Sequence, residues 1–185
     1  MKNRNCIYIA ILFLITGFTT QAQIFISTTG KTSFFSSARL ENIDATSKKT
    51  NVVLSTTTND VLVKVLISSF VFNNGLMQEH FNETYLESAK YPYAQFKGKI
   101  NEEISFTVNG VYPVTVTGSV LIHGVEIIRT IPGTVTVDKN TITLETDFIV
   151  PAAKHKIDIP KDKISNISPD ITVHVNAVCI PYVKK

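Results

Sequence analysis

Cysteine and tryptophan are nearly missing from this sequence. Its 185 residues include two cysteines and no tryptophan. Cys6 lies in an N-terminal segment that we expect to be removed, which would leave Cys179 alone. A single cysteine cannot make an intrachain disulfide or a multi-cysteine metal site. We therefore expect a domain that folds on its hydrophobic core, as a chain of about 160 residues can, with Cys179 as a buried and inert thiol.

The chain also has little excess of positive or negative charge. Charged residues make up 18% of the chain, and the formal net charge is +3. Two basic residues, Lys2 and Arg4, belong to the expected leader, so residues 23–185 carry 16 basic and 15 acidic side chains. A nearly neutral domain lacks the basic surface of a nucleic-acid-binding protein. The hydrophobic content of 44% excludes a disordered chain.

Familiar catalytic and nucleotide-binding motifs are absent from the sequence. It has no G-x-S-x-G elbow, no P-loop and no G-x-G-x-x-G fingerprint. Its histidines at positions 80, 123, 155 and 174 are dispersed, with no H-E-x-x-H motif and no paired spacing. We expect no catalytic residues, no metal site and no cofactor. His123, in a predicted turn, and His174, on the polar side of a predicted strand, are interpreted as solvated side chains.

The N-terminus has the form of a signal peptide. The basic sequence MKNR precedes an apolar run from Cys6 to Phe18, and the small-residue sequence TTQAQ follows it. The run is shorter than the roughly 20 residues that cross a bilayer, and no later segment offers a second candidate. We predict a signal peptide over residues 1–22, cleaved after Ala22, and a periplasmic or secreted protein without stable membrane insertion. A retained N-terminal anchor is the alternative.

Most of residues 23–185 follow a period of two, in which apolar β-branched residues alternate with polar ones. The clearest runs are 114–123, 142–150 and 171–179. This alternation is typical of half-buried strands. Further strands are predicted at Thr32–Ser37, Asn51–Ser55, Val61–Phe72, Ala94–Ile100, Ile104–Val108 and Val125–Val137.

Short connections join these runs, which indicates antiparallel neighbours. Asn109-Gly110 suits the positive φ angles of a tight hairpin. His123-Gly124, a predicted tight turn, separates two long runs, and residues 138–140 separate two more. Pro132-Gly133 interrupts one long run, where we expect a bend or a bulge.

One segment breaks the alternation. Between Gly75 and Leu86, apolar side chains recur at helical spacing, and the preceding Asn73-Asn74 pair can cap a helix start. A short helix among antiparallel strands fits a closed or nearly closed barrel, whose edges must be paired or covered. We therefore predict one all-β domain over residues 23–185, an antiparallel barrel of about eight strands with a short helical insertion.

The segment around this helix resembles the signature of a known family. Residues 68–98 read SSFVFNNGLMQEHFNETYLESAKYPYAQFKG. They resemble the YceI-like, or polyisoprenoid-binding, family, whose pattern runs S-F-x-F, L-M-x-E-H-x-x-x-x-Y-L and K-Y-P-x-A-x-F-x-G. The sequence GSVLIHGV over residues 118–125 resembles the family's G-x-L-T-I-H-G-V hairpin, and Phe35-Ser36 with residues 43–46 also match. The family's tyrosine-containing segment is replaced here by Pro151–His155.

The resemblance implies a lipocalin-like barrel that holds a long apolar molecule, such as a polyprenyl phosphate or a quinone tail. We expect His80 and Tyr85 near the polar head of such a ligand, because an imidazole or a phenol can hydrogen-bond a carbonyl or phosphate oxygen. Alternatively, the aromatic rings fill the barrel as core and His80 braces the helix. The side chains expected to line the cavity are Phe70, Phe72, Leu76, Met77, Phe81, Phe96 and Phe148.

Three classes of function follow from this reading. The first is non-enzymatic binding and carriage of a long-chain isoprenoid or related lipid in the periplasm. The second is an enzyme acting on such a lipid, for which the sequence shows no converging catalytic set. The third is a small outer-membrane barrel, which fits less well because the aromatic residues gather in one region. The sequence leaves open whether the protein forms a homodimer.

Overall fold

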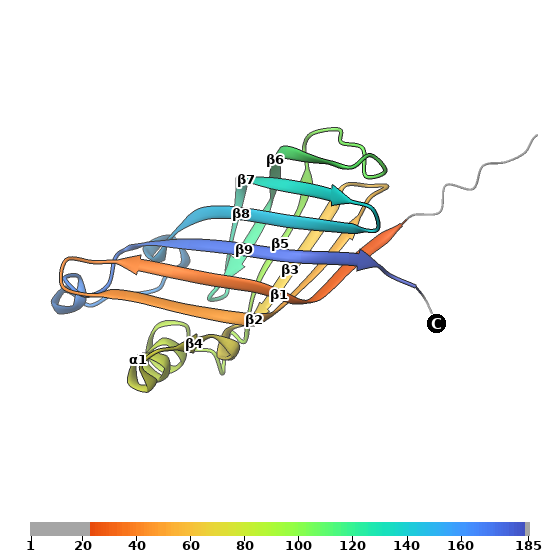
Figure 1. The fold of residues 1–185 in the computed structure, drawn as a ribbon. Coiled ribbons are helices and arrows are strands. Elements are labelled where there is room, and N and C mark those ends of the chain that lie inside the picture. Colours follow the sequence, from red (N-terminus) through yellow and green to blue (C-terminus); the bar gives the residue numbers. More distant parts are fainter. Residues whose placement is uncertain (1–22, 184–185) are drawn as a thin grey trace, which may run out of the picture.

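The computed structural model describes residues 23–183 and shows a barrel of antiparallel strands (Figure 1). The predicted leader, residues 1–22, lies outside the described residues. The strands of the barrel are β1 (Ile24–Ser37), β2 (Asn42–Ser55), β3 (Asp60–Leu66), β5 (Tyr93–Ile100), β6 (Gly110–Ile122), β7 (Val125–Asp138), β8 (Thr141–Pro151) and β9 (Asp170–Pro181).

These eight strands form one closed ring. Their order is β1-β9-β8-β7-β6-β5-β3-β2, and a further pairing of β1 with β2 closes the sheet. A two-residue strand, β4 (Val71–Phe72), pairs with β2 beyond the end of β3. The predicted all-β antiparallel barrel of about eight strands is therefore confirmed.

The alternation in the sequence corresponds to the inner and outer faces of the wall. On β2, Val52 and Leu54 are buried, whereas Val53 between them is 38% exposed. Successive residues of a strand point to opposite faces, so burial of every second residue places one set of side chains inside the barrel.

Two of the predicted short connections are confirmed. His123 and Gly124 have φ angles of 51° and 72° and connect β6 to β7. Lys139, with a φ of 52°, lies in the connection between β7 and β8. In the connection between β6 and β7 both residues have a positive φ, which matches the right-handed twist of a hairpin.

The predictions of a strand over Ile104–Val108 and of a hairpin at Asn109-Gly110 are wrong. Residues 101–109 form an irregular loop, and neither Asn109 nor Gly110 has a positive φ. The alternation arises because Ile104 and Phe106 pack on the hydrophobic core. The Glu102 carboxylate holds the loop to β6 by accepting from the Thr115 N–H at 2.7 Å and from its hydroxyl at 2.8 Å.

Four other predicted strands differ in detail. The segments predicted over residues 32–37 and 51–55 are only the later parts of the longer strands β1 and β2. The run predicted over residues 61–72 is split by a 3-10 turn, η1 (Ile67–Ser69), in which the Ser69 hydroxyl donates to the Leu66 carbonyl at 2.6 Å. The bulge expected at Pro132-Gly133 is absent from the ladder between β6 and β7, which keeps its register there. On the opposite edge of β7 the pairing with β8 covers only Thr134 to Asp138, so it stops just after Pro132-Gly133.

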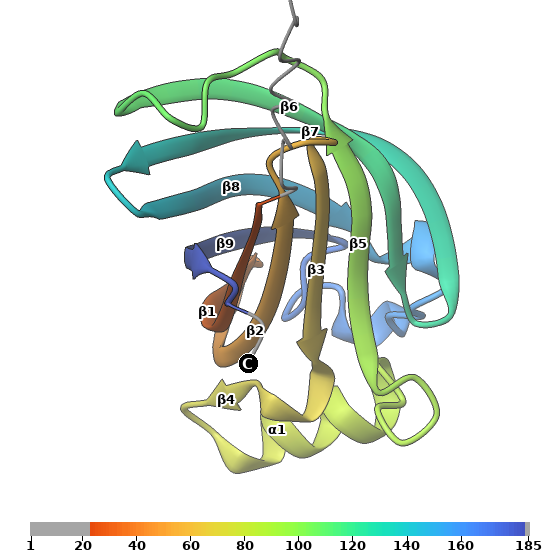
Figure 2. The same cartoon turned by 90° about the vertical axis from the view of Figure 1, so that its right-hand side faces the viewer.

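The predicted helical insertion is confirmed. Helix α1 (Gly75–His80) continues into a turn of π-helix, η2 (Phe81–Tyr85). The Asn74 side chain caps its start by accepting from the Leu76 N–H at 2.9 Å and from the Met77 N–H at 3.4 Å. Figure 2 shows α1 and β4 lying across the barrel below β3.

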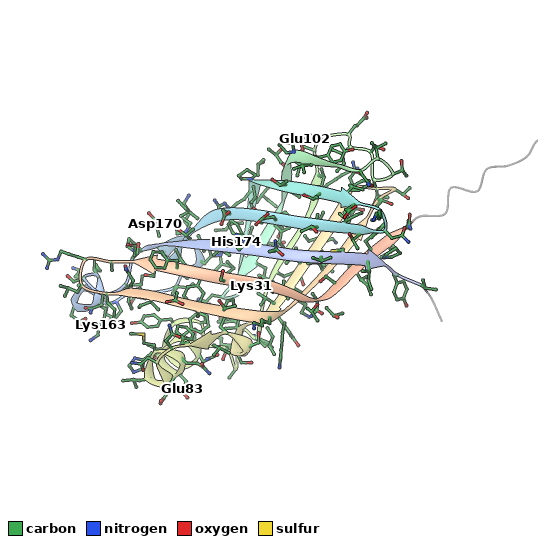
Figure 3. All side chains as sticks on the ribbon, in the orientation of Figure 1. Lys31, Glu83, Glu102, Lys163, Asp170 and His174 are labelled. Atoms are coloured by element: carbon green, nitrogen blue, oxygen red, sulfur yellow. The ribbon has the colours of Figure 1, made fainter. Side chains whose placement is uncertain are left out.

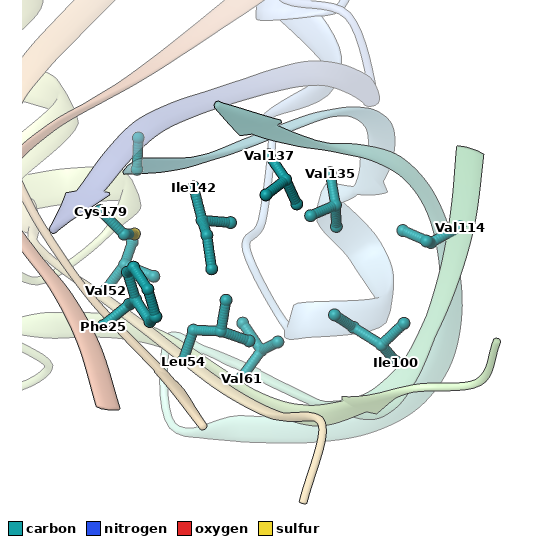
Figure 4. Packing of buried hydrophobic residues seen from close by; sticks show 11 residues of the cluster. Phe25, Val52, Leu54, Val61, Ile100, Val114, Val135, Val137, Ile142 and Cys179 are labelled. Atoms are coloured by element: carbon teal, nitrogen blue, oxygen red, sulfur yellow. The ribbon is translucent and has the colours of Figure 1, made fainter. Parts of the chain in front are cut away.

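Buried hydrophobic side chains fill one end of the barrel, which we call the closed end (Figure 4). Every barrel strand contributes to this cluster, and Leu54, Ile142 and Cys179 are at most 1% exposed. The cluster lies at the end of the barrel where β1 begins and β9 ends. Two of its members, Phe25 and Cys179, are close to those strand termini. The opposite end of the barrel, which we call the open end, is bordered by the hairpin between β1 and β2.

Candidate binding cavity

Beyond the closed-end cluster the barrel is hollow. Its cavity has a volume of about 530 Å³, within the range of small-molecule binding sites. Val52, Val61 and Val114 of the closed-end cluster also line its floor. Its mouth is bordered by the hairpin between β1 and β2, by α1, and by the segment 157–167 that precedes β9.

Four phenylalanine rings form the cavity wall beneath the helix. Phe34 of β1 stacks on Phe81 with ring centroids 5.3 Å apart, and Phe72 lies 5.0 Å from Phe81. Phe70 completes the group, 5.4 Å from Phe34 and 5.7 Å from Phe81. Aromatic pairs at these distances attract one another beyond the burial of their area. The cluster therefore fastens the helical insertion to the barrel and gives the cavity an apolar surface.

Two glycines facing each other on neighbouring strands keep part of the interior free of side chains. Gly98 of β5 pairs with Gly118 of β6. A Cβ atom at Gly118 would lie 2.3 Å from the Gly98 Cα and from the Lys97 carbonyl oxygen, so no larger residue fits without moving backbone. A Cβ atom at Gly98 would lie 2.5 Å from the ring of Phe96. The Phe96 ring therefore occupies space that these glycines leave open.

The side chains expected to form the site do meet at one cavity. Each of the nine lines it: Phe70, Phe72, Leu76, Met77, His80, Phe81, Tyr85, Phe96 and Phe148. Phe70 is buried, Tyr85 is half-buried and His80 is exposed. Phe70 also belongs to a buried core cluster, so the core and cavity interpretations both hold for that ring. That these residues contact a ligand stays a prediction.

Sequence reasoning missed two parts of the lining. Phe34 lies at the centre of the aromatic cluster, and its position on the inward side of β1 could have been read from the alternation of Thr32, Phe34 and Ser36. The other part is the segment 157–167, which contributes Ile157, Ile159 and Ile167. Because this segment is irregular apart from one short 3-10 turn, η4 (Lys161–Lys163), its spacing carries no comparable signal.

A polar network joins three segments beside the cavity. The His123 Nε2 lies 2.7 Å from the Glu87 carboxylate, and its Nδ1 lies 3.2 Å from the His155 carbonyl oxygen. The side chain of His123 is only 11% exposed, so its interpretation as a solvated residue is wrong. The network fastens the end of the helical insertion to the hairpin between β6 and β7.

The His155 ring is fully buried beneath that hairpin. Its Nδ1 lies 3.3 Å from the Val125 carbonyl oxygen, and its Nε2 has no hydrogen-bond partner among the described residues. Burial lowers the pKa of His155 below the ordinary value of 6.5, and nearby Arg129 and His123 lower it further. The ring is therefore held in its neutral form.

Cys179 is buried, as expected. Its side chain is fully enclosed, and burial raises the pKa of the thiol to about 12. Within residues 23–183, no group of histidine, cysteine or acidic side chains is arranged to hold a metal ion. In the same part of the chain no helix is both long enough and apolar enough to cross a membrane.

These features define a lipocalin-like antiparallel barrel with an apolar internal cavity that is open at one end. The family model of the YceI-like domain matches residues 16–179. The chain therefore belongs to the YceI-like family, as the sequence resemblance implied. No protein among the curated sequences matches the chain.

Three solved structures are similar to this chain. A polyisoprenoid binding domain from Saccharophagus degradans, implicated in plant cell wall breakdown, is 13% identical; the match covers 88% of this chain and 100% of that one, with a TM-score of 0.73. BcnA from Burkholderia cenocepacia is 18% identical, with coverages of 80% and 95% and a TM-score of 0.67. The YCEI protein of Campylobacter jejuni is 16% identical, with coverages of 74% and 81% and a TM-score of 0.55. At these identities the likeness shows the fold.

Proposed function

We propose that this protein binds and carries a long-chain isoprenoid, or a related lipid such as a polyprenyl phosphate or a quinone, without chemical change. The observation that carries this proposal is the apolar cavity of about 530 Å³, which is closed at one end and open at the other. The similarity to a polyisoprenoid binding domain supports the ligand class.

The length of the ligand follows from the energetics of binding. Burial of an apolar chain contributes about 0.8 kcal/mol per methylene. Association costs roughly 4–15 kcal/mol in lost freedom of motion. A short chain would barely bind, whereas about 20 buried carbons contribute roughly 16 kcal/mol and exceed that cost. A long prenyl or acyl chain is therefore favoured over a small apolar molecule.

The polar head of the ligand would lie at the mouth, near His80 and Tyr85. Both side chains line the cavity, whereas neighbouring Glu79 and Glu83 do not. An imidazole and a phenol can each hydrogen-bond a quinone carbonyl or a phosphate oxygen.

The outer face of the barrel supports a carrier over a barrel embedded in a membrane. Charged side chains are exposed along the strands, including Lys31, Lys97, Lys99, Glu145 and Asp147. An embedded barrel instead needs an apolar outer band. With the predicted leader, this points to the periplasm or the exterior of the cell as the place of action.

The direct test is native mass spectrometry of the protein purified from the fraction into which its host exports it, followed by extraction of the bound molecule. A stoichiometric prenyl lipid or quinone is the expected result. A protein that stays ligand-free after incubation with long-chain isoprenoids and fatty acids would contradict the proposal.

Substitutions in the lining test the site itself. Phe72→Asp and Met77→Glu put a carboxylate into the apolar wall, where burial of an unpaired charge is costly. Each should weaken retention of an isoprenoid by about tenfold or more. Lys139→Glu, in the exposed connection between β7 and β8, is the matched control and should retain ligand like the parent protein. Equal retention by all three variants would exclude this lining as the site.

A further inference from the structure

Three exposed aliphatic side chains surround the mouth of the cavity. Leu40, Leu76 and Ile164 are 66%, 59% and 52% exposed. Leu76 itself lines the cavity, and the other two each adjoin a lining residue, Glu41 and Lys163. We call Leu40, Leu76 and Ile164 the apolar rim. Exposed apolar groups gathered around a cavity mouth are typical of a surface that meets a partner or a membrane.

The rim is held by hydrogen bonds between segments far apart in the sequence. The Leu40 N–H donates to the Ser165 carbonyl at 2.8 Å, and the Ser168 N–H donates to the Ser36 hydroxyl at 2.9 Å. The segment carrying Ile164 is thus fastened to the hairpin between β1 and β2. The rim is therefore a formed surface of the open end.

Positive charge accompanies the apolar rim. Residues 154–163 carry four exposed lysines, at positions 154, 156, 161 and 163, against two aspartates. One of these lysines, Lys163, lies 3.5 Å from Asp162, and the others have no acidic partner among the described residues. Figure 3 places Lys163 at the tip of the open end, whereas Glu83, in η2, lies on the side of the helical insertion that faces away from the barrel. The segment beside Ile164 is therefore locally basic.

The open end lies away from the start of β1 and the end of β9. β1 begins and β9 ends at the closed end, on the opposite side of the molecule (Figure 1). The apolar rim can therefore meet a broad flat surface without obstruction by either of these strand ends.

We propose that the open end docks on an anionic lipid bilayer, with the apolar rim in the head-group region and the lysines of residues 154–163 against anionic head groups. This inference rests on the proposed function. Exposing a long apolar chain to water costs more with every methylene, so direct contact between mouth and bilayer lets the ligand move without crossing water. Aliphatic side chains combined with lysines are the means by which peripheral proteins bind anionic membranes.

The test is sedimentation with lipid vesicles, using protein expressed with its own leader and processed by its host. Vesicles of phosphatidylcholine are compared with vesicles that also contain phosphatidylglycerol. The double variant Leu40→Glu/Ile164→Glu should bind the anionic vesicles about tenfold more weakly than the parent protein. Val111→Glu, on the outer wall of β6 where Val111 is 65% exposed, is the matched control and should bind normally. Added salt should weaken binding of the parent protein.

A second measurement separates this inference from the proposed function. Equilibrium binding of a fluorescent geranylgeranyl lipid is measured without vesicles, and its rate of transfer from anionic vesicles is measured separately. We expect equal equilibrium binding by the parent and both variants, with transfer slowed about tenfold in the double variant alone. Absence of equilibrium binding by the parent protein would overturn the proposed function.

Two results would overturn the docking proposal. The first is equal sedimentation and equal transfer by the parent protein and the double variant. The second is that the parent protein does not bind vesicles but forms a dimer, and that the double variant is a monomer. The apolar rim would then be an interface between two copies of the chain.

Discussion

At the scale of single residues, the size of the interior depends on positions with no side chain. Gly98 and Gly118 face each other on β5 and β6, and the two backbones approach so closely that a Cβ atom at Gly118 would lie 2.3 Å from the opposite strand. The ring of Phe96 lies over Gly98. These glycines therefore determine both the spacing of two wall strands and the position of one lining residue.

Gly118→Ala should lower the stability of the barrel. Forcing a methyl group into this contact should cost about 2–3 kcal/mol, which lowers the melting temperature by roughly 5–10 °C in a domain of this size. Gly75→Ala is the matched control, because a Cβ atom at Gly75 meets nothing within 4 Å. Thermal unfolding of both variants checks the prediction, and a Gly118→Ala protein as stable as Gly75→Ala would show that the strands can separate freely.

At the scale of elements, the short helix depends on its cap and on its aromatic contacts. Helix α1 has six residues, and none of them is buried. Isolated helices of this length are not stable in water. Its position therefore comes from Asn74, which caps its first turn, and from Phe81, which joins the aromatic cluster.

Asn74→Ala should loosen this element. Loss of the cap should cost about 1 kcal/mol, which corresponds to roughly fivefold faster exchange of the Leu76 and Met77 amide protons if opening is local. Hydrogen exchange measures this effect. Asn73→Ala alters the exposed neighbour that does not cap the helix and should leave exchange unchanged. Equal acceleration in both variants would mean that the cap is not its cause.

Elements with regular spacing could be predicted from the sequence, and irregular ones could not. The long strands repeat apolar residues every second position, which the burial pattern matches. The helix repeats them every third to fourth position, and its start is marked by the capping Asn74. Residues 104–108 repeat in the same way, but Ile104 and Phe106 cover the closed end as a loop. Alternation reports which residues are buried, and a loop packed on the core produces it as well as a strand.

The candidate site was predictable where a motif or a period marked it. The nine lining residues came from the family signature and from the inward side of a strand, and all of them border the cavity. Ile157, Ile159 and Ile167 border it as well, but their segment folds against the hairpin between β1 and β2. That contact joins positions more than a hundred residues apart, which local spacing cannot reveal.

At the scale of the whole molecule, the buried His155 should make stability depend on pH. Because burial lowers its pKa in the folded protein below 6.5, the unfolded chain takes up a proton more readily than the folded one. Above pH 6.5 the neutral ring makes its full contribution to the free energy of unfolding. This contribution is lost as the pH falls from 6.5 through the lowered pKa of the folded state.

Melting temperatures measured between about pH 7.5 and pH 5 check this prediction. The parent protein should lose stability over this interval, and His155→Gln should show a shallower fall even if its overall stability is lower. His80→Gln, at an exposed histidine, should follow the parent curve. Parallel curves for the parent protein and His155→Gln would exclude His155 as the titrating group.

The enclosed thiol of Cys179 makes the protein a ready background for site-directed labelling. It is the single cysteine of residues 23–183, it is fully buried, and its pKa is raised to about 12. A thiol attacks as its thiolate, so a maleimide dye at neutral pH should leave the folded protein unlabelled. A cysteine introduced at Ile164 should then take up one dye, and its emission colour would report when the mouth passes from water into lipid.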